Sequence, residues 1–427
     1  MSAGATHSAR WSPWHAAILA FGLIAAAVVR LILLPTPGLT GDLDQFVLWV
    51  HGIATQPLGR AYDQNLSFPP GMVYVWGVLA MVEPGFRSAM DSADPGIRAI
   101  MKTPASLADF GLAAGVAYAL RARPAWAIVA ALGIALHPAV IDVSAWWGQY
   151  ESIYVLAGLV AFLLAVADRP LLASIGLAVA LMTKPQALPF LVPFGAWFLG
   201  RYGLRRSLAF AAVGVGTIVV LWLPFIPAGG PGAYLRNLSE YQGDIFAVLS
   251  LRAWNPWWLV QEAYGAGEFI SDSSRVAGPL TLRALGLVAA AVLEGLVFLT
   301  VIRAPSPRTL TLGLAASTLV AFASLTTMHE RYAFAALVFL APLIPDRRVF
   351  AAWLTLGVVM TVNLLAAAPP SPELAAALPI FGTLGVVGSV AMTCLTVVVV
   401  VLLLRDSSPL PAKASSERDA IPAQVVG

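Results

Sequence analysis

The chain has 427 residues, of which 59% are hydrophobic and only 11% are charged. A soluble domain needs about 25% charged residues to cover its surface, so this composition indicates an integral membrane protein. The net charge of +3 is small and gives no sign of a nucleic-acid partner. The single cysteine, Cys394, lies inside the last apolar run, which excludes a disulfide framework.

Apolar runs predict an all-α fold with about twelve transmembrane helices, because each run approaches the ~20 residues that cross a bilayer. The first run follows Arg10 and continues without a convincing small-residue cleavage site, so we expect a retained span rather than a removed signal peptide. In chain order, the predicted spans are 13–34, 100–120, 124–141, 152–167, 170–183, 186–200, 207–226, 279–302, 309–326, 332–345, 349–367 and 379–404.

The positions of arginine and lysine predict how these spans are oriented, because cytoplasmic loops carry an excess of both residues. With Arg10 inside and twelve spans, every basic loop falls on the cytoplasmic side. Both termini are then cytoplasmic, and we expect a multi-pass protein of the plasma (inner) membrane. The basic loops are 121–124, 168–170, 201–206, 303–308, 346–348 and the tail from Arg405.

One apolar piece, residues 69–81, does not fit this count. It has about 13 residues, opens with Pro69-Pro70, and would invert every later loop if it crossed the membrane. We therefore predict a re-entrant or surface-lying segment inside a first outer loop of 35–98. A second large outer loop covers 227–278. Residues 1–405 form one transmembrane domain, and 406–427 form a disordered cytoplasmic tail.

The stretch GDLDQFVLWVH (41–51) places two carboxylates, Asp42 and Asp44, directly after the first span. Its apolar residues recur at helical spacing, which predicts an amphipathic helix lying at the membrane surface with Phe46 and Val50 in the interface. The alternative interpretation is that Asp42 is an N-cap and Asp44 a first-turn acid.

Other unusual polar residues also fall on the predicted outer face. In WWGQYES (146–152), Trp147, Gln149 and Glu151 are typical of a sugar-binding surface, although tryptophan at a span end also forms interfacial belts. Lys184 lies between two short apolar stretches, where it either faces a cavity or snorkels to the headgroups. Arg30, at the outer end of the first span, is expected to snorkel.

Two further outer segments carry ionisable groups. MHERY (328–332) contains His329, Glu330 and Arg331, either as binding residues or as a solvated turn. In the loop 227–278, Arg252 precedes several tryptophans. This segment is either a lid over a lipid-linked substrate, with Arg252 near its phosphate, or an interfacial helix. No P-loop, no GxGxxG in a βαβ context and no HExxH occurs, so ATP or nicotinamide chemistry has no support.

Five segments in the same order resemble the motifs of the GT-C glycosyltransferases that use lipid-phosphate sugars. The nearest resemblance is to the ER glucosyltransferases that use dolichyl-phosphate glucose and to bacterial relatives of the GPI mannosyltransferases. Two departures are Asp44, where relatives often have Glu, and Pro185, which interrupts the Lys-Gln pair. The five segments are GDLDQFVLW (41–49), SFPPGM (67–72), HPAVIDVSAWWGQYES (137–152), TKPQALPFLVPF (183–194) and MHERY (328–332).

The resemblance implies a GT-C fold, with an extracytoplasmic cavity and surface-lying helices in the first loop. It also implies an inverting, metal-independent single displacement in which Asp42 is the general base and Asp44 a second acid. The donor would be a polyprenyl-phosphate hexose, mannose or glucose, and the acceptor a glycan or glycolipid at the outer face of the bilayer. No cofactor is expected, and a divalent ion between the two carboxylates is the mechanistic alternative. We expect a monomer.

Each remaining candidate residue takes a role from the needs of this reaction. A leaving phosphate needs cations or hydrogen-bond donors, for which the candidates are Lys184, His329, Arg331 and Arg252. Sugar and acceptor binding is assigned to Trp147, Gln149, Glu151 and Glu330. Two other functions stay open: a ligase or polymerase of lipid-linked glycans, and a non-enzymatic twelve-span transporter. Transporters often show internal repeats and charges at the membrane midplane, whereas these charges gather at one face.

Overall fold

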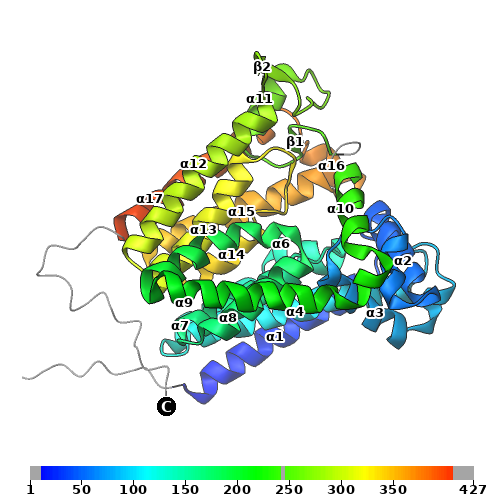
Figure 1. Cartoon of the computed structure of the whole chain (residues 1–427), viewed down its shortest axis with the longest axis horizontal. Coiled ribbons are helices and arrows are strands. Elements are labelled where there is room, and N and C mark those ends of the chain that lie inside the picture. The colour runs from blue at the N-terminus through cyan, green and yellow to red at the C-terminus, as the bar shows by residue number, and fades with distance from the viewer. Residues whose placement is uncertain (1–10, 242–245, 407–427) are drawn as a thin grey trace, which may run out of the picture.

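In the computed structural model, which describes residues 11–241 and 246–406, nearly all of the chain is helical (Figure 1). Long helices pack side by side into one bundle, and the strands within these described residues form two short pairs. The protein is thus an all-α membrane protein, as the composition predicts. The first ten residues and the tail 407–427 lie outside the described residues, so the predicted disordered tail and the predicted location of both termini stay predictions.

The α-helices are α1 Pro13–Leu33, α2 Thr40–Thr55, α3 Pro70–Val82, α4 Pro95–Ala119, α5 Pro124–Ala135, α6 Pro138–Ile141, α7 Glu151–Val166, α8 Pro170–Thr183, α9 Leu191–Trp222, α10 Gly230–Glu240, α11 Pro256–Tyr264, α12 Leu282–Arg303, α13 Pro307–Ser324, α14 Phe334–Leu340, α15 Arg347–Ala367, α16 Pro372–Ala377 and α17 Thr383–Asp406. Shorter helical turns are η1 Leu58–Asp63, η2 Pro84–Arg87, the π-helix η3 Asp142–Trp147, η4 Pro185–Phe190, η5 Leu223–Ala228 and η7 Ala341–Leu343. The strands are β1 Ser250–Leu251, β2 Arg275–Ala277, β3 Leu280–Thr281 and β4 Met328–His329.

Within the described residues, five segments are long and apolar enough to cross a membrane, or six if the bent pair Pro124–Ala135 and Pro138–Trp147 counts as one span. The five include α1, α12, α15 and α17, together with the long segment Pro185–Ala228. Other predicted spans form shorter apolar helices, among them α7 and α8. The number twelve therefore stays a prediction.

The long segment around α9 reverses direction at Gly203, whose φ of 73° and ψ of 170° are not helical. Phe198 and Phe210 lie on opposite sides of this glycine, and their rings are 5.4 Å apart. In a straight helix, twelve residues would separate them by about 18 Å. The two halves of α9 therefore form a hairpin, and its turn lies in the predicted basic loop 201–206.

Loops that are predicted to be cytoplasmic meet one another. Arg308, at the start of α13, bonds to Asp346 at 2.6 Å and to Asp406 at 2.5 Å. Arg201 lies 3.7 Å from Asp168. These contacts join loops that the charge pattern assigns to the same side of the membrane, as alternate crossing of the spans requires.

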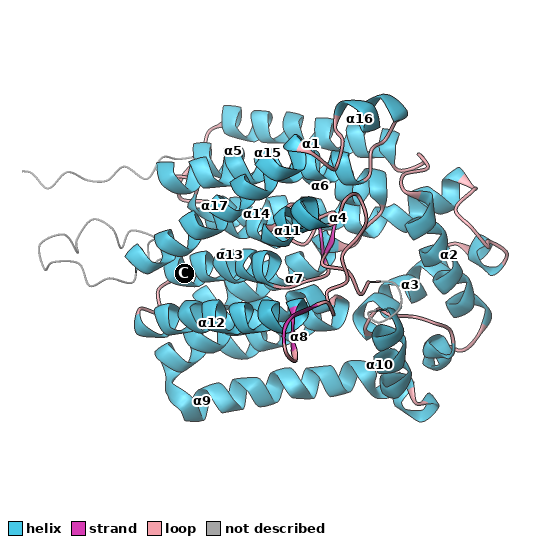
Figure 2. Cartoon of the chain, turned by 90° about the horizontal axis from the view of Figure 1, so that it is seen from above, coloured by secondary structure: helices cyan, strands magenta, loops and turns pink. Residues whose placement is uncertain are grey.

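The helix α3 begins and ends near the same end of the bundle. Arg98 donates to the carbonyl of Pro35 at 2.8 Å, and Lys102 donates to that of Thr36 at 2.7 Å, so both ends of the loop 35–98 meet. In both views, α2, α3 and α10 lie together at the right-hand end (Figure 1, Figure 2). A re-entrant or surface-lying α3 fits this arrangement better than a full crossing.

The orientation of the bundle can be tested by labelling single cysteines from each side of the membrane. In a chain that lacks Cys394, Ser207→Cys is expected to react only from the cytoplasm and Ser271→Cys only from outside, because the charge pattern places the two loops on opposite sides. A membrane-impermeant maleimide applied to intact cells and to inverted vesicles measures both. Ser88→Cys reacting only from the cytoplasm would contradict the topology, since α3 would then have to cross.

The amphipathic helix α2 is packed inside the protein, which corrects the expectation that its apolar side lies in the membrane interface. Phe46 is 6% exposed and Val50 is fully buried. The ring of Phe46 lies 5.9 Å from that of Trp76 on α3 and 5.3 Å from that of Tyr150 before α7. Aromatic packing within the first outer loop, rather than lipid, thus fixes α2.

Arg30 is a core residue, and the prediction that it snorkels is wrong. Its guanidinium is 2% exposed and bonds to Asp109 on α4 at 2.8 and 3.0 Å. Ser144 and Ser152 donate to the same carboxylate. A charge buried at this depth is stabilised by an oppositely charged partner, and α4 supplies that partner.

A half-buried acid, Glu294 in the middle of α12, supports η4. The hydroxyl oxygen of Ser317 lies 2.7 Å from Glu294 Oε2 and 2.7 Å from the carbonyl of Pro189. A hydroxyl has one proton and a carbonyl can only accept, so both bonds form together only if Glu294 carries a proton of its own. We infer a neutral Glu294 that holds η4 against α12 and α13.

This inference predicts different results for two substitutions. Glu294→Gln is expected to keep the thermal midpoint of the purified protein nearly unchanged, because the amide can donate to Ser317. Glu294→Ala is expected to lower stability by about 1–3 kcal/mol, since a buried partner is lost. Equal losses in both variants would show that Glu294 is ionised instead.

Candidate functional site

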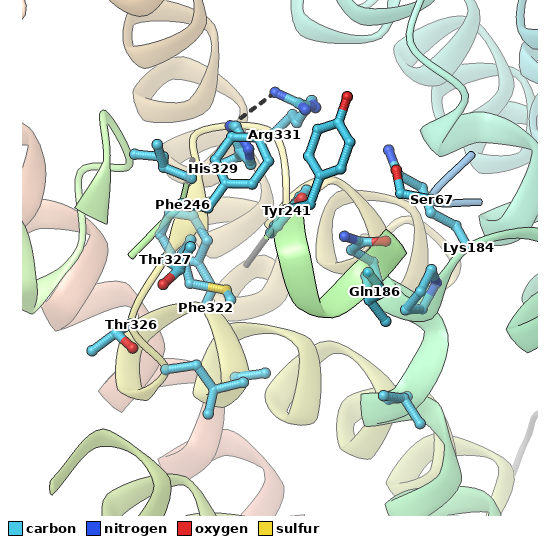
Figure 3. Close-up of a pocket in the computed structure, with 18 of the residues that line it drawn as sticks. Ser67, Lys184, Gln186, Tyr241, Phe246, Phe322, Thr326, Thr327, His329 and Arg331 are labelled. Atoms are coloured by element: carbon cyan, nitrogen blue, oxygen red, sulfur yellow. Dashed lines mark hydrogen bonds between the residues drawn. The ribbon is translucent and has the colours of Figure 1, made fainter. Parts of the chain in front are cut away.

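A cavity of about 540 Å³ lies among α2, η4, the C-terminal end of α10 and the β4 segment (Figure 3). It brings together residues that are far apart in the sequence. Of the sequence-predicted candidates, five line its wall: Asp42, Gln149, Lys184, His329 and Arg331. Figure 3 shows Lys184 on one side of the cavity and His329 with Arg331 on another.

Asp42 lies in the first turn of α2 and makes no N-cap bond, so the capping interpretation is wrong. Its Oδ2 accepts from Trp147 Nε1 at 3.0 Å and from Gln149 Nε2 at 2.7 Å. Its Oδ1 receives no hydrogen bond from the described residues. The carboxylate is therefore held at one oxygen, while the other stays available to a ligand.

The turn at Gly148 places both donors on the same carboxylate. Gly148 has a φ of 90°, a conformation that other residues rarely adopt. A Cβ at this position would lie 3.1 Å from Leu43 and 3.1 Å from Lys102. The interfacial-belt interpretation does not hold for Trp147, which is 4% exposed and bonds to Asp42.

Asp44 is not among the cavity residues. Its Oδ1 accepts from the backbone nitrogen of Ser92 at 2.8 Å and from the Ser92 hydroxyl at 2.5 Å. It therefore fastens the first outer loop to α2, and we no longer assign it a catalytic role.

A buried ion-pair cluster joins two residues of the cavity wall, Lys184 and Arg331, to carboxylates that do not line the cavity. Glu151, at the first position of α7, is fully buried and lies 2.5 Å from Lys184 Nζ and 3.2 Å from Arg331 Nε. Arg331 also bonds to Glu330 at 2.8 Å. The side chains of Lys184 and Arg331 are only 4% and 8% exposed, so neither the snorkelling lysine nor the solvated turn describes these residues.

Local backbone structure positions Lys184 and His329 at the cavity wall. The helix α8 ends at Thr183, and Lys184 takes an extended conformation before Pro185 opens η4. His329 is positioned by a parallel pairing of β1 with β4, in which it lies opposite Leu251. The backbone reaches this pairing through Thr327, whose φ is 62°.

His329 is neutral in this arrangement. Its Nδ1 lies 3.1 Å from Arg331 Nη1, and a guanidinium can only donate, so Nδ1 must be the acceptor. Burial lowers the pKa of His329 below its ordinary value, and the positive charge of Arg331 lowers it further. The ring proton therefore lies on Nε2.

The charges at this site nearly cancel, so the candidate phosphate-binding cations do not form an electropositive pocket. Lys184 and Arg331 carry two positive charges, while Asp42, Glu151 and Glu330 carry three negative ones. The cations share a cavity as predicted, but each has a carboxylate partner. An anionic ligand would have to be bound by directed hydrogen bonds rather than by an excess of positive charge.

Arg252 lies outside the cavity, contrary to its predicted place at a donor phosphate. Its side chain is exposed, its φ is 61°, and its Nη1 donates to the carbonyl of Ala367 at 2.6 Å. The tryptophans that follow do not anchor an interfacial helix. Trp254 and Trp258 are buried in a cluster against α17.

The sequence interpretation missed several polar residues of the cavity. Gln45, Ser67, Gln186 and Tyr241 all line it. Gln45 falls one helical turn after Asp42 on the same face of α2, and this spacing was a usable signal. Nothing in the sequence marks Tyr241, which reaches the cavity because α10 packs beside η1 (Figure 3).

A scan of protein-family models finds no match to this chain, and a search of curated proteins also finds none. Within the described residues, no group of three or more His, Cys, Asp or Glu side chains is arranged to hold a metal ion. The site must therefore be interpreted from its own geometry.

Proposed function

We propose that the protein is an inverting GT-C-type glycosyltransferase. It moves a hexose, mannose or glucose, from a polyprenyl-phosphate sugar to a glycan or glycolipid acceptor at the extracytoplasmic face. One observation carries this proposal: a fixed carboxylate with one unoccupied oxygen shares a cavity with hydrogen-bond donors suited to a phosphate. The resemblance of the five sequence motifs supports the same assignment.

Asp42 acts as the general base in this proposal. Trp147 and Gln149 hold its Oδ2, which leaves Oδ1 to accept the proton of the acceptor hydroxyl. These two hydrogen bonds hold the carboxylate in place. That orientation lowers the entropic cost of aligning acceptor and donor for an in-line displacement.

The leaving phosphate is bound by donors elsewhere on the cavity wall. Lys184 has two further N–H groups beyond its bond to Glu151, and His329 offers Nε2–H. Arg331 is held by Glu151 and Glu330, so its guanidinium is preorganised. Fixed donors of this kind stabilise charge that develops on the leaving group.

Sugar and acceptor hydroxyls need partners that are not already engaged. Trp147 and Gln149 bond to Asp42, while Glu151 and Glu330 pair with the cations, so all four residues already have partners. We assign hydroxyl recognition instead to four other polar residues that line the same cavity, Gln45, Ser67, Gln186 and Tyr241. Buried Oε1 of Gln186 has no hydrogen-bond partner among the described residues.

A direct assay tests the proposal. Purified protein is incubated with radiolabelled polyprenyl-phosphate mannose or glucose and a membrane acceptor extract, and lipid-linked products are counted. Transfer from the monophosphate donor supports the proposal, and transfer that survives exhaustive chelation supports metal independence. Transfer of pyrophosphate-linked glycans alone would identify a ligase or polymerase, and uptake without transfer would identify a transporter.

A further inference from the structure

We propose that Arg283, in the first turn of α12, binds the phosphate of a lipid-linked substrate at the bilayer-facing edge of the cavity. This inference rests on the proposed function for the chemical class of the ligand. It follows from comparing the basic side chains that line the cavity.

Three basic residues of the described chain line the cavity wall: Lys184, Arg283 and Arg331. The side chains of Lys184 and Arg331 are 4% and 8% exposed, whereas that of Arg283 is 46% exposed. A ligand can therefore reach the guanidinium of Arg283 without displacing a buried carboxylate. Arginine is also the residue whose planar donors best match phosphate oxygens.

The guanidinium of Arg283 is held in a fixed orientation. Its Nε and Nη2 donate to the two oxygens of Asp272, both at 2.7 Å. Asp272 is fully buried and also accepts from Thr326 Oγ1 at 2.9 Å. Nη1 of Arg283 makes no hydrogen bond to the described residues, so this donor remains for a ligand.

The position of Arg283 indicates where the ligand comes from. It lies at the end of α12, one of the segments long and apolar enough to cross a membrane. One turn further along, Leu287 also lines the cavity and is 56% exposed. The cavity thus borders an apolar helix surface beside Arg283, an arrangement that suits a phosphate carried on a polyprenyl tail.

The test measures binding of radiolabelled polyprenyl monophosphate to the purified protein in a neutral detergent. Unlabelled polyprenol, which has the same tail without the phosphate, and inorganic phosphate are used as competitors. The wild-type protein is expected to prefer polyprenyl phosphate over polyprenol. Arg283→Gln is expected to lose about tenfold in affinity for the phosphate, the order expected from one charge-assisted hydrogen bond.

Matched variants separate this role from a structural one. Arg275→Gln removes an exposed arginine of the same outer loop that does not line the cavity, and it should bind as the wild type does. Asp272→Asn breaks the ion pair but keeps the charge of Arg283, so it should retain more affinity than Arg283→Gln. Equal losses in Asp272→Asn and Arg283→Gln would overturn the proposal in favour of a purely structural pair.

The remaining outcomes are also distinct. If the wild-type protein does not prefer polyprenyl phosphate over polyprenol, the proposed donor class itself fails. If it does, but Arg283→Gln shows the same preference, the role of Arg283 is refuted while the proposed function stands. Displacement by equimolar inorganic phosphate would indicate a site for free phosphate and would also refute the lipid-linked assignment.

Discussion

Asp42→Asn is expected to lower the turnover of the purified protein by roughly 10²–10⁴-fold, the range typical of general-base catalysis. The amide keeps the size of the side chain, and its oxygen can still accept from Trp147 and Gln149, so the fold should persist. Donor binding should remain largely intact because the base acts on the acceptor. Initial rates at saturating donor, together with a separate donor-binding measurement, test both parts.

Asp44→Asn is the matched control for this experiment. It makes the same chemical change two residues away, on a carboxylate that bonds to Ser92 and does not line the cavity. We expect a modest loss of stability and a much smaller effect on turnover. If Asp42→Asn keeps a near-normal rate, the base assignment is wrong. Asp44 is then excluded by its position, and Glu151 is fully buried and does not line the cavity.

Glu151→Gln is expected to destabilise the protein by about 3–5 kcal/mol, because it leaves two buried cations without their shared carboxylate. Lys184 lies 2.5 Å from Glu151 and Arg331 lies 3.2 Å from it, and neither cation can reach bulk water without moving. Thermal unfolding of the purified protein in detergent measures the loss. Activity should fall as well, since Lys184 and Arg331 would lose their fixed positions.

A double-mutant cycle with Lys184→Met separates the ion pair from packing. The double variant removes both charges, so we expect it to be more stable than the sum of the two single changes predicts. Additive losses would mean that Glu151 stabilises the fold without interacting with Lys184. Ser152 lies beside Glu151 but bonds to Asp109, so Ser152→Ala tests whether any change at the start of α7 has the same effect.

The sequence by itself determined the class of protein and much of the arrangement of the chain. Composition and apolar runs depend on transfer of side chains from water, a local property, so an all-helical membrane protein could be predicted without a structure. The basic loops predicted which ends of helices meet, and the contacts of Arg308 and Arg201 agree with that grouping. The helical spacing of 41–56 likewise predicted α2, because amphipathic periodicity is also local.

Only the tertiary structure decided which polar residues face the cavity and which lie behind it. Asp42 and Asp44 are two residues apart, yet one bonds to Trp147 and Gln149 and the other to Ser92. Glu151 was assigned to sugar and is the buried partner of Lys184, while Arg252 was assigned to phosphate and Arg283 lines the cavity instead. Such differences depend on pairings between separate segments, from 33 residues apart for Glu151 and Lys184 to 105 for Asp42 and Trp147. In a low-dielectric interior, a charge is stabilised by the partner that packing brings to it, and one sequence does not specify that partner.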